Sequence, residues 1–172
     1  MAADRNGRPA AAGRPAAVDS DPALGDRAAA PFRRPESVLV VIHTPALECL
    51  LLERVHPPGF WQSVTGSLEW GESAAAAARR EVLEETGIEP HGLRDGGVAQ
   101  RFEIWPAWQR KYAPGVTHNL EHLWYLELPE TMPVQLNAAE HRAYRWCGLE
   151  EAVRAVASRT NKEALERLRS DR

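Results

Sequence analysis

The sequence has little cysteine, no long hydrophobic run and almost no excess charge. Two cysteines, Cys49 and Cys147, lie among apolar residues without a CxxC partner. We expect them to be buried free thiols in a reducing cytoplasm, with a disulfide as the open alternative. The run of large apolar residues Val38–Ile42 is far shorter than the roughly 18 residues that a membrane span requires. Charged residues also interrupt every apolar stretch near the N-terminus, so we predict neither a signal sequence nor a membrane protein.

The charge balance limits the possible partners. The chain has 172 residues, with 21 Lys and Arg against 24 Asp and Glu, which gives a net charge of −3. This balance argues against a general nucleic-acid binder and against a protein that binds acidic membranes. A polyanionic substrate must therefore be held by local positive charges or by a metal ion.

Composition divides the chain into a leader and one domain. Residues 1–30 contain eleven alanines, three prolines and equal numbers of arginine and aspartate, without an apolar period of a helix or strand. We predict a flexible leader over residues 1–31. Residues 32–172 have enough apolar residues for a hydrophobic core, so they are predicted to form a single domain.

Hydrophobic patterns predict a mixed α/β domain. The run Ser37–Ile42 indicates a strand that is buried on both faces. Ser73 and Gly87 flank an alanine-rich stretch and are typical of the cap and the left-handed end of a helix over Ala74–Thr86. The remaining predicted strands cover residues 50–52, 60–65, 98–105, 122–128 and 143–146, and the remaining predicted helices cover residues 149–157 and 162–169.

Three glutamates in the predicted helix are unfavourable for its stability. Glu81, Glu84 and Glu85 have i, i+3 and i+4 spacing, so their carboxylates share one face and repel one another. They also lie near the helix C-terminus, where the helix dipole disfavours anions. A divalent cation such as Mg²⁺ removes this conflict, since it binds carboxylates together with substrate phosphates. The alternative is a solvated charged face on which Arg80 pairs with Glu84.

The spacing around these glutamates resembles the Nudix box. Gly66 is followed after five residues by Glu72 and after seven more by the segment Arg80–Ile88. A chance match to this pattern is on the order of 10⁻¹⁰ per start position. The resemblance implies a Nudix fold, an α/β/α sandwich around a mixed β-sheet, in which water cleaves a diphosphate linkage with Mg²⁺ or Mn²⁺. It further implies that Glu81, Glu84 and Glu85 are metal ligands, that the Gly66 carbonyl is another, and that Arg80 is an orienting ion-pair partner.

Segments outside the box resemble a narrower family, the bacterial dihydroneopterin triphosphate diphosphatases of folate biosynthesis. They include Arg34–Ile42, Phe60–Ser67, Tyr112–Thr117 and Glu140–Trp146. This resemblance implies that Glu140 is a further metal ligand or the base for the attacking water, so the implied catalytic residues are Glu84, Glu140 and Arg80. It also implies substrate contacts by a set of polar and aromatic residues: Arg33, Arg54, Thr65, Phe102, Glu103, Ile104, Trp105 and Ser158.

Elementary chemistry supports some of these contacts. The guanidinium groups of Arg33 and Arg54 can pair with phosphate oxygens, although a surface ion pair is the alternative for each. A flat pterin ring needs an aromatic or aliphatic wall. The candidates are Trp61, Phe102, Trp105 and Trp108, of which Trp105 is favoured, and an ordinary core position is the alternative for each tryptophan. The loop with Arg110 and Lys111 can add positive charge near the site, and a solvated turn with basic flanks is the alternative.

Two other functions remain open from the sequence. The same chemistry could act on nucleoside triphosphates, such as dATP or a damaged nucleotide, because an aromatic pocket does not separate a pterin from a purine. A Nudix-like binding module without turnover is the alternative from another class, and the complete box argues against it. In every case the expected partner is a small molecule, with the protein a monomer or a small homo-oligomer.

Overall fold

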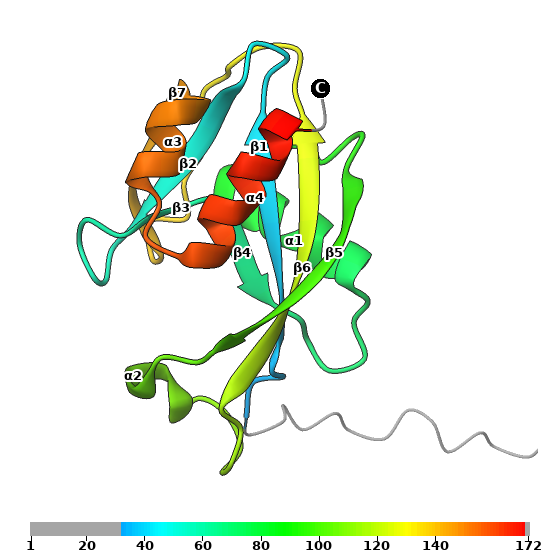
Figure 1. Cartoon of the computed structure of the whole chain (residues 1–172), viewed down its shortest axis with the longest axis vertical. Coiled ribbons are helices and arrows are strands. Elements are labelled where there is room, and N and C mark those ends of the chain that lie inside the picture. Colours follow the sequence, from blue (N-terminus) through cyan, green and yellow to red (C-terminus); the bar gives the residue numbers. More distant parts are fainter. Residues whose placement is uncertain (1–31, 171–172) are drawn as a thin grey trace, which may run out of the picture.

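The computed structural model describes residues 32–170. They form one sheet of seven strands, together with four helices (Figure 1). The predicted leader over residues 1–31 lies outside the described residues. The elements in chain order are β1 (Glu36–His43), β2 (Glu48–Arg54), β3 (Trp61–Gln62), β4 (Val64–Ser67), α1 (Ala74–Thr86), β5 (Arg94–Glu103), α2 (Pro106–Gln109), β6 (His118–Glu127), β7 (His141–Gly148), α3 (Leu149–Ala155) and α4 (Arg159–Ser170).

The sheet is mixed and centred on β1. Strand β1 runs parallel to β6 over its whole length, and β6 pairs antiparallel with β5. On its other side β1 pairs antiparallel with β4 through residues 37–40 and with β2 at its far end. Strand β7 adds to β2. A strand with neighbours on both sides and helices on both faces must be apolar throughout, as predicted for Ser37–Ile42.

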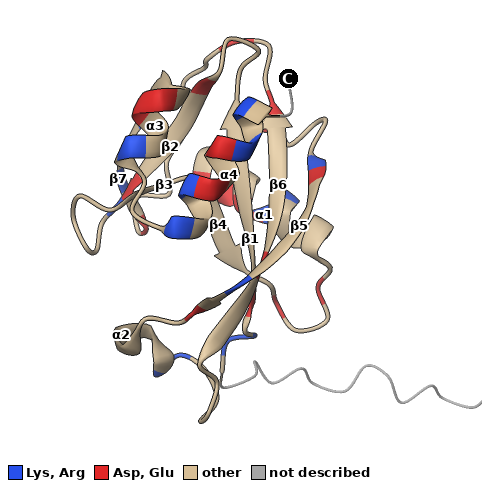
Figure 2. Ribbon diagram, viewed as in Figure 1, with Lys and Arg blue, Asp and Glu red and all other residues tan. Residues whose placement is uncertain are grey.

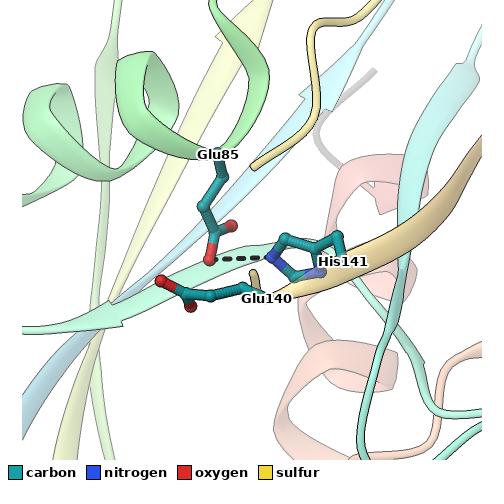
Figure 3. Close-up of side chains that lie close together, drawn as sticks. All are labelled: Glu85, Glu140 and His141. Atoms are coloured by element: carbon teal, nitrogen blue, oxygen red, sulfur yellow. Dashed lines mark ion pairs between the residues drawn. The ribbon is translucent and has the colours of Figure 1, made fainter. Parts of the chain in front are cut away.

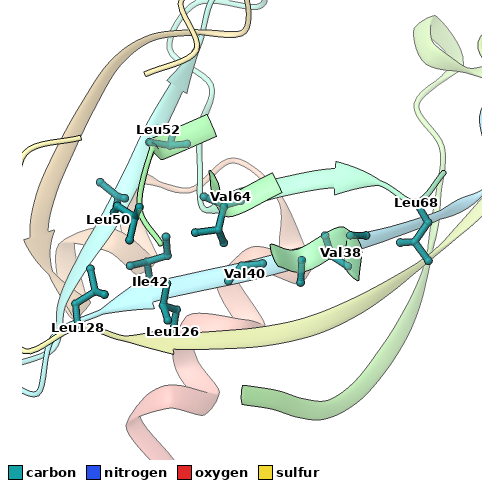
Figure 4. Close-up of a cluster of buried hydrophobic side chains, with 13 residues drawn as sticks. Val38, Val40, Ile42, Leu50, Leu52, Val64, Leu68, Leu126 and Leu128 are labelled. Atoms are coloured by element: carbon teal, nitrogen blue, oxygen red, sulfur yellow. The ribbon is translucent and has the colours of Figure 1, made fainter. Parts of the chain in front are cut away.

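Two hydrophobic clusters lie on opposite faces of the sheet. The first joins Val38, Val40 and Ile42 to α1 through Ala78 and Val82 (Figure 4). The second joins Leu39 and Val41 to α3 and α4. Alternate residues of β1 thus supply both clusters, because successive side chains point to opposite faces of a strand. The predicted α/β fold, with helix layers on both sides of a mixed sheet, is confirmed.

Helix α1 has the predicted boundaries. The Ser73 hydroxyl accepts a hydrogen bond from the Ala76 N–H at 3.2 Å, which satisfies one of the free amides of the first turn. Gly87 ends the helix with φ of +69°, and its N–H bonds to the Leu83 carbonyl. These caps fix the rotation at which Glu81 and Glu85 face the sheet.

Other boundaries differ from the sequence prediction. The predicted strand over residues 60–65 is interrupted at Ser63, whose N–H donates to Asn161 Oδ1 of α4 at 2.8 Å instead of joining the ladder. The strand predicted at residues 98–105 begins at Arg94 and ends at Glu103, because Pro106 opens the short helix α2. None of the helices within residues 32–170 is both long and apolar enough to cross a membrane.

Candidate active site

A cavity of about 890 Å³ opens beside the C-terminal half of α1. It brings together residues from the segment before β1, from strands β1, β2, β4, β5 and β6, and from the segments after α2 and before β7. Many residues singled out in the sequence line it, namely Arg33, Arg54, Thr65, Gly66, Arg80, Glu81, Glu84, Phe102, Ile104, Trp108, Lys111 and Glu140. The cavity also has lining residues that the sequence did not single out for binding, including Ser37, Asn119 and Glu121.

The three glutamates of the box differ in exposure. Glu81 and Glu85 are buried, with Glu85 only 1% exposed, whereas the Glu84 side chain is 54% exposed at the cavity margin. Burial raises the pKa of Glu81 to about 7, although its bond to Arg80 acts in the opposite direction. Burial also raises the pKa of Glu85, against the effect of its neighbour His141. Without a cation, these carboxylates are therefore costly to keep ionised.

Arg80 holds the acidic cluster together. Its Nε and Nη2 donate to the two carboxylate oxygens of Glu72 at 2.9 Å each, and its Nη1 donates to Glu81 at 2.7 Å and to Glu84 at 3.2 Å. Nη2 also donates to the Ser67 carbonyl. The Arg80–Glu84 pair of the solvated-face alternative therefore exists, but it is one bond of a wider network. A planar guanidinium can serve several carboxylates at once and so fixes their orientation.

A second acidic group lies at the end of α1. Oxygens of Glu85 and Glu140 and a ring nitrogen of His141 lie within 4.8 Å of one another. Figure 3 shows Glu85 reaching from α1 toward Glu140 and His141 at the start of β7. His141 Nε2 is 3.1 Å from Glu85 Oε1, yet neither oxygen of Glu85 has a hydrogen bond of good geometry from the described residues.

These donors fit a Mg²⁺ or Mn²⁺ ion. The carboxylates of Glu81, Glu84, Glu85 and Glu140 can offer oxygen atoms, which both ions accept as ligands. The strongest sign is the buried Glu85 carboxylate: within residues 32–170 neither of its oxygens has a hydrogen bond of full geometry, whereas a buried carboxylate normally does. The absence of a side chain at Gly66 leaves room for the Glu81 carboxylate beside the strand.

Basic side chains also line the cavity. Arg33, Arg54 and Lys111 all line it, and Figure 2 shows the basic segments that lead into β1 and follow α2. Burial lowers the pKa of Lys111, and the nearby Arg33 and Arg54 lower it further. Arg54 and Lys111 also lie over the Trp108 ring, at 5.6 and 5.9 Å from its centroid. These three side chains supply the positive charge that a polyphosphate requires.

Of the aromatic candidates, Phe102 and Trp108 line the cavity, and the favoured Trp105 does not. Trp105 does not line the cavity; it precedes α2, is 53% exposed, and stacks on Trp108 at 5.4 Å between ring centroids. Trp108 lines the cavity in its place, together with Phe102 and Ile104. The reason is the turn at Pro106, which ends the strand before Trp105.

Two further predicted contacts lie outside the cavity lining. Glu103 is exposed at the end of β5, opposite His118 of β6. Ser158 accepts a hydrogen bond from the Asn161 N–H at 3.1 Å, so it caps the first turn of α4. The geometry of the described residues gives Ser158 a local structural role.

Sequence reasoning missed His141, which is 1% exposed and follows Glu140 directly. It also gave no role to Asn119 and Glu121. Their signal was weak, since both lie before the strand predicted over residues 122–128, and a polar residue in an alternating pattern normally faces solvent. Only the position of β6 inside the sheet makes them buried.

Helices on both faces of a mixed sheet, with a glutamate-rich helix beside a cavity, define the Nudix class of protein. A family model described as NUDIX domain matches residues 33–168, and the chain belongs to this family. The dihydroneopterin triphosphate diphosphatase of Escherichia coli strain K12 is 42% identical over 140 residues, which cover 78% of this chain and 92% of that protein. The enzyme of the same name from Haemophilus influenzae is 37% identical over 79% of this chain and 88% of that protein.

Solved structures agree with this assignment. The structure of the E. coli dihydroneopterin triphosphate pyrophosphohydrolase matches with a TM-score of 0.74 and 40% identity, covering 79% of this chain and 95% of that chain. The resemblance predicted from the box and from its flanking segments is confirmed, as is the classification as a Nudix hydrolase. The roles of the individual site residues stay predictions.

Proposed function

We propose that this chain hydrolyses dihydroneopterin triphosphate to dihydroneopterin monophosphate and pyrophosphate, a step of folate biosynthesis in the cytoplasm. One water is consumed and the bond between the α- and β-phosphates is broken. The proposal is supported by relatives with this activity in their names, which match over most of their length. The two free cysteines are consistent with a reducing compartment.

The observation that carries the proposal is the presence of acidic and basic side chains in one cavity. Glu81, Glu84 and Glu140 line it together with Arg33, Arg54 and Lys111. A protein with a net charge of −3 thereby concentrates cationic side chains where a triphosphate must bind, in the same cavity as carboxylates that can bind a divalent ion.

Glu81, Glu84, Glu85 and Glu140, with the Gly66 carbonyl, are the proposed ligands of Mg²⁺, for which Mn²⁺ can substitute. The bound ion neutralises phosphate charge and orients the phosphates and the water. Arg80 positions Glu81 and Glu84 through its hydrogen bonds. Glu84 and Glu140 are the exposed carboxylates of the set, so either can accept the proton of the attacking water.

Arg33, Arg54 and Lys111 bind the triphosphate. Their charges face phosphate oxygens, and the Trp108 ring under Arg54 and Lys111 restrains the orientation of both side chains. Thr65 of β4 and Phe102 of β5 also line the cavity and are proposed contacts of the pterin.

Pyrophosphate release from purified protein tests the proposal. With Mg²⁺, dihydroneopterin triphosphate should be cleaved with a higher kcat/KM than dATP or other nucleoside triphosphates, and chelation of the metal should stop the reaction. Cleavage of dATP with a higher kcat/KM than the pterin would support the nucleotide alternative. No turnover of either compound with Mg²⁺ or Mn²⁺ would contradict the enzymatic assignment.

A further inference from the structure

Three buried polar side chains line the cavity without a role in metal or phosphate binding. Asn119 is 2% exposed, Glu121 is 8% exposed and Ser37 is 7% exposed, and all three face the cavity. Polar groups at such depth are costly unless they are hydrogen-bonded.

The sheet places these residues side by side. Asn119 and Glu121 are alternate residues of β6, so their side chains point to the same face. Ser37 of β1 is the register partner of Glu121, and Phe102 of β5 is the register partner of Asn119. Phe102 therefore provides an apolar wall next to the polar pair.

The hydrogen bonds of this group are incomplete. Asn119 Nδ2 donates to Ser37 Oγ at 2.7 Å, but Asn119 Oδ1 has no partner among the described residues. Burial raises the pKa of Glu121, and a hydrogen bond from Thr160 acts in the opposite direction. Asn119 Oδ1 is thus available to a ligand that carries N–H donors, and the carboxylate of Glu121, two residues along the same strand, also lines the cavity and can accept hydrogen bonds.

We infer that Asn119 and Glu121 recognise the amino and ring N–H edge of a 2-amino-4-oxo heterocycle, with its face against Phe102. This inference rests on the proposed function, because a pterin has this edge. A guanine has the same donors, whereas adenine presents one amino group beside an acceptor nitrogen. Asn119 and Glu121 are therefore residues that determine specificity for the ring, separate from the groups that act on the phosphates.

Paired kinetics of two variants test the inference. Glu121→Gln and Asn119→Ala should each lower kcat/KM for dihydroneopterin triphosphate by about tenfold or more, while kcat/KM for dATP changes by less than about twofold. Glu127→Gln is the matched control, since Glu127 lies on the same strand and outside the cavity lining. An equal loss for both substrates would show a general structural role and would overturn the inference, as would unchanged selectivity.

A measurement on the unmodified protein does not depend on how the variants fold. As competitors of pterin hydrolysis, dGTP and dITP differ only in the 2-amino group, so dGTP should inhibit with a Ki at least about fivefold lower. Equal inhibition, or none by either nucleotide, overturns the inference. Failure of the wild-type protein to cleave the pterin would instead contradict the proposed function, so the two failures are distinguishable.

Discussion

Gly66 of β4 lies against the carboxylate of Glu81 of α1. A Cβ at position 66 would lie 1.9 Å from both Glu81 Cδ and Glu81 Oε1, which is far closer than any real contact. The first residue of the box is therefore glycine because the strand and the carboxylate occupy adjoining space. A methyl group at this position must displace the end of the Glu81 side chain.

Gly66→Ala should consequently impair metal-dependent turnover more than stability. We expect kcat to fall by about 10- to 100-fold, because a displaced ligand weakens the metal site while the flexible carboxylate absorbs the strain. Activity at increasing Mg²⁺ and the melting temperature measure the two effects. Gly148→Ala is the control, since a Cβ there meets no atom within 4 Å and the backbone φ is −60°. Wild-type activity in Gly66→Ala would contradict the assignment of Glu81.

Removal of one ligand charge should abolish most turnover. Glu84→Gln and Glu85→Gln should each lower kcat by at least about 100-fold, because an amide is a poorer ligand and a poorer base than a carboxylate. Circular dichroism should show that both variants keep the fold. Glu130→Gln, at an exposed position outside the cavity lining, should retain full activity. If both box variants keep wild-type rates, the proposed metal site is wrong.

Arg80→Lys should separate charge from geometry. The lysine keeps the positive charge but cannot make the bidentate bond to Glu72 while also bonding to Glu81 and Glu84. We expect kcat to fall by about 10- to 100-fold with the ability to bind Mg²⁺ retained in part. Kinetics across a Mg²⁺ series provide the measurement. Full activity in this variant would mean that the guanidinium group of Arg80 does not position the carboxylates of Glu81 and Glu84.

The buried Glu121 should make stability depend on pH. Burial raises its pKa in the folded protein, so the unfolded chain loses this proton at a lower pH than the folded one. The contribution of Glu121 to the free energy of unfolding is therefore fully present below the ordinary glutamate pKa, where its carboxyl group is protonated. This contribution is lost as the pH rises and the carboxyl group ionises. Glu121→Gln should therefore melt several degrees higher than the wild type at pH 7, with the difference vanishing below about pH 4. Thermal melts across pH measure it, and a difference that is independent of pH would exclude ionisation as the cause.

The two cysteines should be unreactive in the folded protein. Burial raises the pKa of the Cys49 thiol to about 12, with a smaller effect of Cys147, its register partner on β7. Burial also raises the pKa of Cys147. A thiol reagent at pH 8 should therefore react slowly with the native protein. After unfolding in guanidinium chloride, two thiols per chain should react. No free thiol after unfolding would favour the disulfide alternative.

The parts of the site that spacing and capping patterns predicted are local in the chain, whereas distant residues such as Arg33, Arg54 and Glu140 were named from the family resemblance alone. Ser73 and Gly87 lie at the two ends of helix α1. Glu81 and Glu85 lie about one turn apart within the same helix. The exposed Trp105 shows the limit of such reasoning, because a strand pattern extended through it while Pro106 turned the chain. The stacking of Trp105 on Trp108 then left Trp108 to line the cavity.

By itself, the sequence determined α1, its caps and the common face of its carboxylates, because hydrogen bonds within a helix and residues a few positions apart decide these features. Only the tertiary structure decided that Glu85 is buried beside His141, that basic side chains from three segments share one cavity with Glu81 and Glu84, and that Asn119 and Glu121 are enclosed. These contacts join residues tens of positions apart. They depend on the pairing of β1 with β6 and on the helices that cover the sheet, and no local pattern records either one.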